Sequence, residues 1–187
     1  VAYLVLKGEL PNKQQLKKFT KEERSNRKLS NQVIKDIEKM PKNAHPMDVT
    51  RTVVSLMGLE DKETSDNSSN ANMRKAMRIF AKTPTAVAAY FRSRKGKKVI
   101  KPSLKLSFSE NFFKMMFGKV PDKEIVKAFD VSLILYAEHS FNVSTFTART
   151  ITSSLSDIHG AITGAIASLK GPLHGGANEA VMHMMKE

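Results

Sequence analysis

The chain has 187 residues, of which 41% are hydrophobic, so it is long enough to bury the core of one helical domain. Lysine and arginine outnumber aspartate and glutamate by 31 to 18, and this net charge of +13 predicts anionic partners: nucleic acid, phosphorylated cofactors, carboxylate substrates or acidic lipid surfaces. Cysteine is absent, which excludes disulfides, thiolate metal sites and cysteine nucleophiles.

The first two helical patterns are separated by turn signals. We expect a first helix to end at Gly8, and Asn12 to cap the helix that follows it. Residues 21–41 alternate charged side chains with hydrophobic ones near helical spacing, which predicts a further helix that Pro41 ends.

A cleaner helical pattern occupies residues 43–61. Pro46 suits the first helical position, and Asp48 lies in the first turn, where a negative charge is favourable. Gly58 is predicted to stop this helix. The polar residues 61–73 that follow predict a loop.

Three segments follow the loop. Residues 73–91 predict a helix that Pro84 kinks or splits, because proline cannot donate a backbone hydrogen bond. The basic run 92–102 predicts a connector, and the next helix is expected to end at Gly118.

The last long segments are helical as well. Residues 121–142 predict a largely apolar helix, and Asp157 is expected to cap a helix over 158–169. Small residues at positions 160, 164 and 168 of that helix would let another helix approach closely. These small residues are compatible with a helix in a dimer interface and with an ordinary core helix. Since no set of alternating strands is visible, the fold class is all-α.

The final stretch places a histidine in a glycine-rich loop before a helix. A Gly-Pro turn breaks the preceding element, and a helical pattern resumes at Asn178. Gly175 and Gly176 remove side chains beside His174, which predicts room for another molecule. His174 is a candidate functional residue, with a satisfied structural histidine as the alternative.

Other side chains offer weaker signals. His139 lies in a polar run with Asn142 and Ser144, where it could bind a carboxylate. We interpret His159 and His183 as surface or satisfied histidines. No HExxH pattern, nucleophile elbow, GxGxxG or P-loop occurs, so we expect no metal site and no catalytic triad.

Several segments resemble the citrate synthase family. The run "LKGPLHGGANEAVM" is similar to that family's signature loop and helix, and "LILYAEHSFNVSTFTART" is similar to a second characteristic segment. "HPMDVTRT" and "LSFSENFFKMMFG" resemble segments of the bacterial citrate and 2-methylcitrate synthases. The resemblance covers nearly the whole chain in collinear order.

The resemblance implies an all-α fold with a large helical domain, which dimerises through packed helices, and part of a smaller domain. It implies condensation of acetyl-CoA, as co-substrate, with oxaloacetate to give citrate and CoA, without a permanently bound cofactor. His174 would stabilise the enolate, His139 would bind the oxaloacetate carboxylate, and Asn142 would line the same site. The acyl-CoA loop would comprise Leu173, Gly175, Gly176 and Asn178.

Some parts that the family needs do not occur in these 187 residues. A second catalytic histidine in a "GxGHPVY"-like segment, a catalytic aspartate and the arginines that clamp oxaloacetate all belong to later segments of the family pattern. We therefore interpret residues 1–187 as one partial domain of a longer enzyme, and we expect this fragment alone to be inactive.

Alternatives remain open at this point. Propionyl-CoA in place of acetyl-CoA would make the parent enzyme a 2-methylcitrate synthase, and one methylene changes specificity by only about 1–3 kcal/mol. A basic helical module that binds nucleic acid is the rival class, although the glycine setting of His174 favours the enzyme without a nucleic-acid partner. The sequence shows no signal peptide and no stretch long enough to span a bilayer, which predicts a cytoplasmic protein without a membrane partner.

Overall fold

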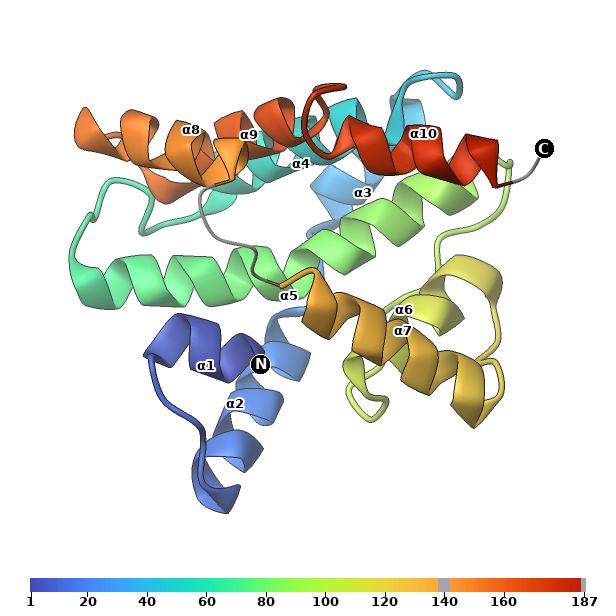
Figure 1. The fold of residues 1–187 in the computed structure, drawn as a ribbon, viewed down its shortest axis with the longest axis horizontal. Coiled ribbons are helices and arrows are strands. Elements are labelled where there is room, and N and C mark those ends of the chain that lie inside the picture. The colour runs from blue at the N-terminus through green and yellow to red at the C-terminus, as the bar shows by residue number, and fades with distance from the viewer. Residues whose placement is uncertain (138–141, 186–187) are drawn as a thin grey trace. The chain divides into compact units, whose positions relative to one another are not determined.

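The computed structural model describes residues 1–137 and 142–185, and in these ranges the chain forms helices and no strands (Figure 1). This confirms the all-α fold class. The chain divides into two compact units. The first comprises Val1–Asn43 and Ala76–His139, and the second comprises Ala44–Lys75 and Ser140–Glu187.

In its described residues the first unit contains six helices, one of them in part. They are α1 (Ala2–Lys7), α2 (Lys13–Asn26), α3 (Asn31–Lys39), α6 (Phe108–Phe117), α7 (Lys123–Leu135) and the longer part of α5 (Ser69–Ser93). The predicted ends at Gly8 and Gly118 are confirmed, since both glycines adopt the left-handed backbone conformation after a helix. Asn12 caps α2 as predicted, and Gln15 completes a capping box.

The prediction of one helix within residues 21–41 is wrong, because the chain breaks between α2 and α3. The carbonyl of Arg27 accepts a hydrogen bond from the Thr85 hydroxyl at 2.7 Å instead of continuing a helical ladder. Ser30 then starts α3, where its hydroxyl accepts from the backbone N–H of Val33 at 3.0 Å. Both groups are satisfied without a continuous helix.

Apolar contacts and aromatic rings hold the first unit together. Buried side chains of α3, α5 and α6 form its core, among them Val33, Ile37, Ala89 and Met115. The rings of Phe112 and Phe113 both pack on Phe129, with centroid distances of 5.5 and 5.1 Å, and this joins α6 to α7.

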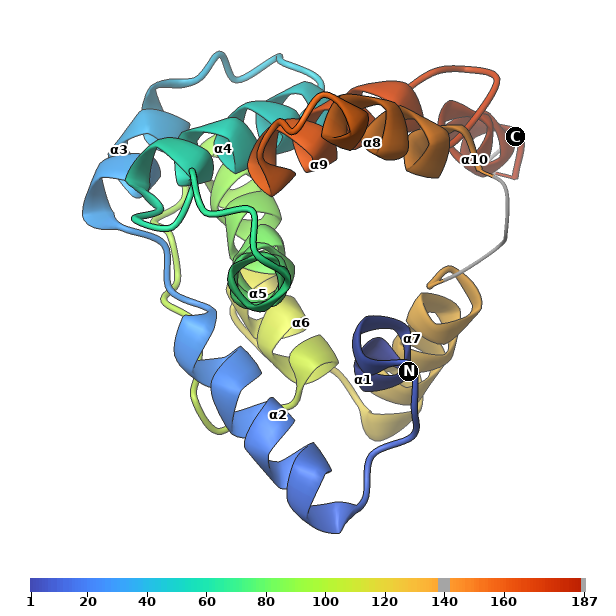
Figure 2. The ribbon, with the colours of Figure 1, turned by 90° about the vertical axis from the view of Figure 1, so that its left-hand side faces the viewer.

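The second unit contains α4 (Pro46–Glu60), α8 (Val143–Ser153), α9 (Ile158–Leu169), α10 (Gly176–Met184) and the first turns of α5. In Figure 2, α9 lies between α4 and α8, and it packs against both. The predicted bounds of α9 are confirmed. Asp157 caps it, accepting from the backbone N–H groups of His159 and Gly160 at 2.8 and 3.0 Å.

Gly58 does not stop α4, which continues to Glu60. The glycine is needed for packing, because a Cβ at position 58 would lie 2.9 Å from the Cβ of His159 on α9. His159 is only 2% exposed, with its ring nitrogens 3.6 Å from Asp61 and 3.7 Å from Asp157. His159 is therefore a buried histidine between two carboxylates, so the surface alternative of the prediction is wrong.

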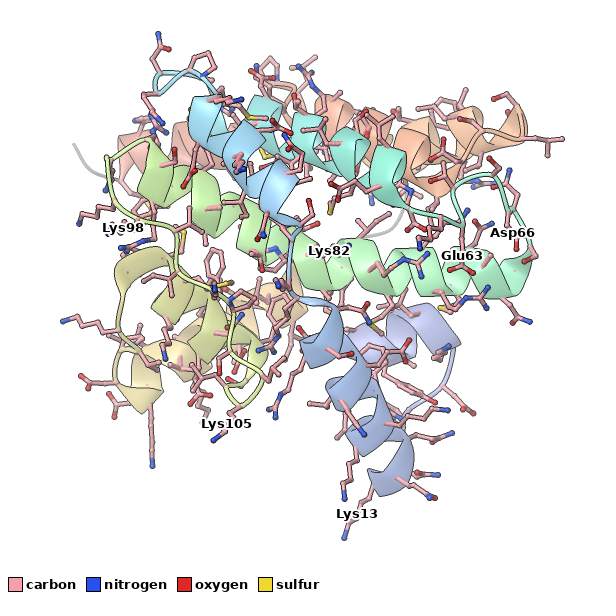
Figure 3. The ribbon with its side chains drawn as sticks, turned by 180° about the vertical axis from the view of Figure 1, so that it is seen from behind. Lys13, Glu63, Asp66, Lys82, Lys98 and Lys105 are labelled. Carbon is pink, nitrogen blue, oxygen red and sulfur yellow. The ribbon has the colours of Figure 1, made fainter. Side chains whose placement is uncertain are left out.

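The structure corrects the start of α5 and one of the two outcomes predicted at Pro84. The helix starts at Ser69, so the last five residues of the predicted loop 61–73 are helical, and it runs through Pro84, so the predicted split is wrong. The rest of the loop is held against the helix by Lys75, whose buried ammonium donates to the carbonyl oxygens of Thr64 and Asp66. Figure 3 shows Asp66 on this loop beside the start of α5.

The small residues of α9 allow close packing within the chain itself. A Cβ at Gly164 would collide with the side chain of Ile151 on α8, so α8 occupies the space beside this glycine. The proposed role of the whole small-residue face in a dimer stays a prediction, but Gly164 serves an intrachain contact.

Replacing Gly58 by alanine is expected to lower the free energy of unfolding by about 1–3 kcal/mol, because the new methyl group forces α4 away from α9. Urea denaturation followed by circular dichroism measures the loss. The matched control is Gly160→Ala on α9, where the new Cβ would meet the hydroxyl of Ser156 at 3.2 Å and the carboxylate of Asp157 at 3.5 Å, with no backbone or ring in the way, and alanine favours the helix. Equal stability of the two variants would contradict the packing role of Gly58.

Candidate functional site

The loop between α9 and α10 is a sequence of tight backbone turns. The backbone N–H of Gly171 donates to the carbonyl of Ser168 at 3.0 Å as α9 ends. The N–H groups of His174 and Gly176 both donate to the carbonyl of Gly171, at 2.9 and 3.1 Å. The loop thus folds back on the C-terminal end of α9 and starts α10 two residues after His174.

Gly175 and Gly176 are required by this turn. A Cβ at Gly175 would lie 2.5 Å from the carbonyl oxygen of Leu169, and a Cβ at Gly176 would lie 2.8 Å from that of Lys170. These are contacts with backbone that cannot rotate away. The predicted reason for the glycines, room for another molecule, is therefore replaced by a different one: they let the loop close on its own helix.

The ring of His174 faces the N-terminus of α8. Its Nε2 atom lies 3.1 Å from the hydroxyl oxygen of Ser144 and 3.4 Å from the backbone nitrogen of the same residue. The ring is partly buried. Two segments that are 30 residues apart in the sequence thus meet at one imidazole.

The two contacts with Ser144 favour opposite tautomers of the neutral ring. The Ser144 hydroxyl donates its proton to Oδ1 of Asn142, so toward Nε2 of His174 it can only accept, whereas the backbone N–H of Ser144 can only donate to Nε2. Where Nε2 accepts the backbone N–H, the ring proton of neutral His174 is on Nδ1. A histidine in this state can donate a hydrogen bond from Nδ1 while α8 orients the other side of the ring.

Asn142 holds the start of α8 in place. Its Oδ1 accepts from the backbone N–H of Thr145 at 2.6 Å and lies 2.7 Å from the hydroxyl of Ser144. Because this oxygen caps the helix, any role of Asn142 toward a substrate rests on its amide nitrogen. Asn142, Ser144 and His174 form one cluster, which we call the His174 cluster.

The remaining predicted site residues lie in different settings. Leu173 is 99% exposed at the tip of the loop, and Asn178 is exposed in the first turn of α10. His139 lies outside the described residues. The sequence placed Ser144 in the polar run around His139 but assigned it no role of its own.

Residues 1–137 and 142–185 contain no group of three or more metal-ligating side chains that could hold an ion. None of the helices in the same ranges combines the length and apolar character that crossing a membrane requires.

The net positive charge of the chain lies in one unit. The first unit has 24 lysines and arginines against 10 acidic residues, and the second has 7 against 8, which together make the 31 and 18 of the whole chain. Lys98 of the basic connector and Lys105 just after it are exposed and belong to the first unit (Figure 3). The His174 cluster belongs to the nearly neutral second unit.

Comparison with known proteins gives consistent matches along the chain. Residues 1–187 match the family described as citrate synthase, C-terminal domain. The chain is 50% identical, over its full length, to a citrate synthase from Mycolicibacterium smegmatis and to a 2-methylcitrate synthase from Mycobacterium tuberculosis strain H37Rv, and covers 50% and 47% of them. It therefore spans about half the length of these curated relatives.

A solved structure has the same fold. It is the ternary complex of carboxymethyl coenzyme A and oxaloacetate with citrate synthase from the thermophilic archaeon Thermoplasma acidophilum. The superposition has a TM-score of 0.89 at 30% sequence identity and covers 95% of this chain and 46% of that one.

Proposed function

The chain belongs to the citrate synthase family, and from this premise we propose that the protein containing it condenses an acyl-CoA with oxaloacetate and releases CoA. The observation that carries the proposal is the His174 cluster, an imidazole oriented by a helix N-terminus within a tight loop. The ligands of the Thermoplasma acidophilum complex, a CoA analogue and oxaloacetate, support these two substrates.

His174 is proposed as the catalytic residue that stabilises the enolate of the thioester. The α-protons of a thioester are weakly acidic, so a base removes one efficiently only if a donor stabilises the charge that develops on the oxygen. In the tautomer whose Nε2 accepts the backbone N–H of Ser144, the ring presents Nδ1–H as that donor. Ser144 is then a positioning residue, because it acts through the ring.

Binding of oxaloacetate is proposed for His139 and for the amide nitrogen of Asn142. The support for Asn142 is its contact with Ser144, which places it next to the His174 ring. The acyl-CoA loop, Leu173, Gly175, Gly176 and Asn178, is proposed to contact the thioester, and the 99% exposure of Leu173 makes its side chain available.

The acyl group stays open between acetyl and propionyl. Relatives named citrate synthase and 2-methylcitrate synthase are equally similar, at 50% identity. A cytoplasmic homodimer also stays a prediction from the resemblance and from the sequence.

The test of the proposed function is CoA release by the protein that contains this chain. We expect release with oxaloacetate plus acetyl-CoA or propionyl-CoA, measured by titrating the free thiol. The two values of kcat/KM should differ by about 10–200-fold, because one methylene in an apolar pocket discriminates by that factor. No release with either thioester would contradict the proposal and would favour the basic nucleic-acid-binding module, whose binding falls steeply with salt.

A further inference from the structure

We propose that the first turn of α4 is a two-point anchor that fixes the loop carrying His174. The inference rests on the proposed function, because it assigns positioning residues to the same site. Lys170, just before the loop, binds Asp48 of α4, and Glu179, just after the loop, binds His45 of α4.

The two ion-pair contacts attach the chain before and after the loop to the same turn of α4. The Lys170 ammonium lies 2.6 Å from Asp48 Oδ2, and the Glu179 carboxylate lies 3.1 Å from Nε2 of His45. His45 is the N-cap of α4, and Asp48 is three residues further along. The residues between Lys170 and Glu179 comprise the loop with His174 and the start of α10.

The His45 contact does not require a charged histidine. Nδ1 of His45 accepts the backbone N–H of Met47 at 3.2 Å, which caps α4. In the neutral ring the proton is therefore on Nε2, and it is donated to Glu179. The anchor on this side persists while the ring is neutral.

The Lys170 contact depends on ionised Asp48. The hydrogen bond from Lys170 is the main cause that holds the pKa of the Asp48 carboxyl below its usual value, and the charges of Lys170, Arg51 and His45 add to it against the cost of desolvation. A lowered pKa means that this contact is present above the ordinary carboxyl range and is lost as the pH falls through the lowered value. At neutral pH both sides of the loop are attached.

The anchor acts on geometry more than on stability. All four side chains are at least 31% exposed, and exposed ion pairs add little to folding. Two attachments that flank one short loop nevertheless restrict the same movement. A displacement of a catalytic group by about 1 Å can lower the rate about 100-fold, so a loosened loop should be seen in kcat.

The test uses Lys170→Met, Glu179→Gln and the double variant in the protein that contains this chain. We expect kcat for CoA release to fall about 3-fold in each single variant and about 10-fold or more in the double variant, while KM for oxaloacetate stays within about twofold. Lys170→Arg should restore kcat, since it keeps the ion pair. Arg51→Gln is the matched control: it removes another partner of Asp48, 3.0 Å away, that does not touch the loop.

A second measurement does not depend on activity. Amide hydrogen exchange at His174 and Gly176 should become at least about fivefold faster in the double variant, while exchange at buried Val53 of α4 is unchanged. Unchanged exchange in the loop would overturn the anchor whatever the activity. Faster exchange in a protein whose wild type releases no CoA would support the anchor and contradict the proposed function. Equal kcat in wild type and double variant, with an active wild type, would also overturn it.

Discussion

Alanine in place of His174 is expected to lower kcat for CoA release by about 10²–10³-fold in the protein that contains this chain. Removing one preorganised donor from a developing oxyanion has an effect of about that size in other enzymes. In the proposed mechanism the donor is the Nδ1–H of the His174 ring, whose Nε2 faces Ser144. The measurement is steady-state CoA release with saturating oxaloacetate.

Two further variants separate catalysis from general damage. His183→Ala removes an exposed histidine of α10 and should leave kcat within about twofold of wild type, as exposed positions usually do. Ser144→Ala should lower kcat by about 2–10-fold, the value of a single hydrogen bond, because the ring stays but loses one orienting contact. If His174→Ala kept more than a third of wild-type kcat, the enolate role of His174 would be wrong.

Replacing Arg27 by methionine is expected to lower the free energy of unfolding by about 3–5 kcal/mol, the usual loss when one partner of a buried ion pair is removed. Arg27 is 1% exposed and makes two bonds of 2.7 Å with the carboxylate of Glu23. It also donates to the carbonyl oxygens of Ser103 and Leu106, at 2.8 and 3.0 Å. Urea denaturation followed by circular dichroism measures the loss.

The control for Arg27 is a second arginine–glutamate pair at the surface. Arg74 binds Glu63, but these side chains are 49% and 30% exposed, so Arg74→Met should change the free energy of unfolding by less than about 1 kcal/mol. A double change, Glu23→Leu with Arg27→Met, should recover part of the stability because no buried charge is then left alone. Equal losses for Arg27→Met and Arg74→Met would show that burial does not govern this pair.

Arg27 also explains how the chain directly after the basic connector is held. The connector has several exposed cations in sequence, which repel one another, and the buried guanidinium of Arg27 fixes the segment that follows it through the backbone carbonyls of Ser103 and Leu106. Within the connector, Arg92 donates to the carbonyl of Lys98 at 2.5 Å. The sequence showed a basic run, but it did not show that Arg92 inside the run and Arg27 outside it hold this part of the chain.

Part of the site was predictable from the sequence. The loop that carries His174, the helix after it and the Asp157 cap of α9 follow from side chains that act on neighbours within a few positions, and such local signals survive in any tertiary context. The family resemblance added the roles of His174, Asn142 and His139. Ser144 needed the fold, because its contact with His174 joins segments 30 residues apart.

The sequence alone determined the helical class, the helix ends at Gly8, Asn12, Gly118 and Asp157, and the loop of His174, because caps and turn residues act through backbone hydrogen bonds within one turn. Only the tertiary structure decided where the helices break or continue against those signals. The hydroxyl of Thr85 donates to the carbonyl of Arg27 just after the end of α2. Inside α4, a side chain at position 58 would collide with His159, so the position is a glycine. The tertiary structure also explains why positions 175 and 176 are glycines, since backbone carbonyl oxygens lie too close for a Cβ at either position. Each of these contacts joins residues that only the folded chain brings together, and a short stretch of sequence does not contain that information.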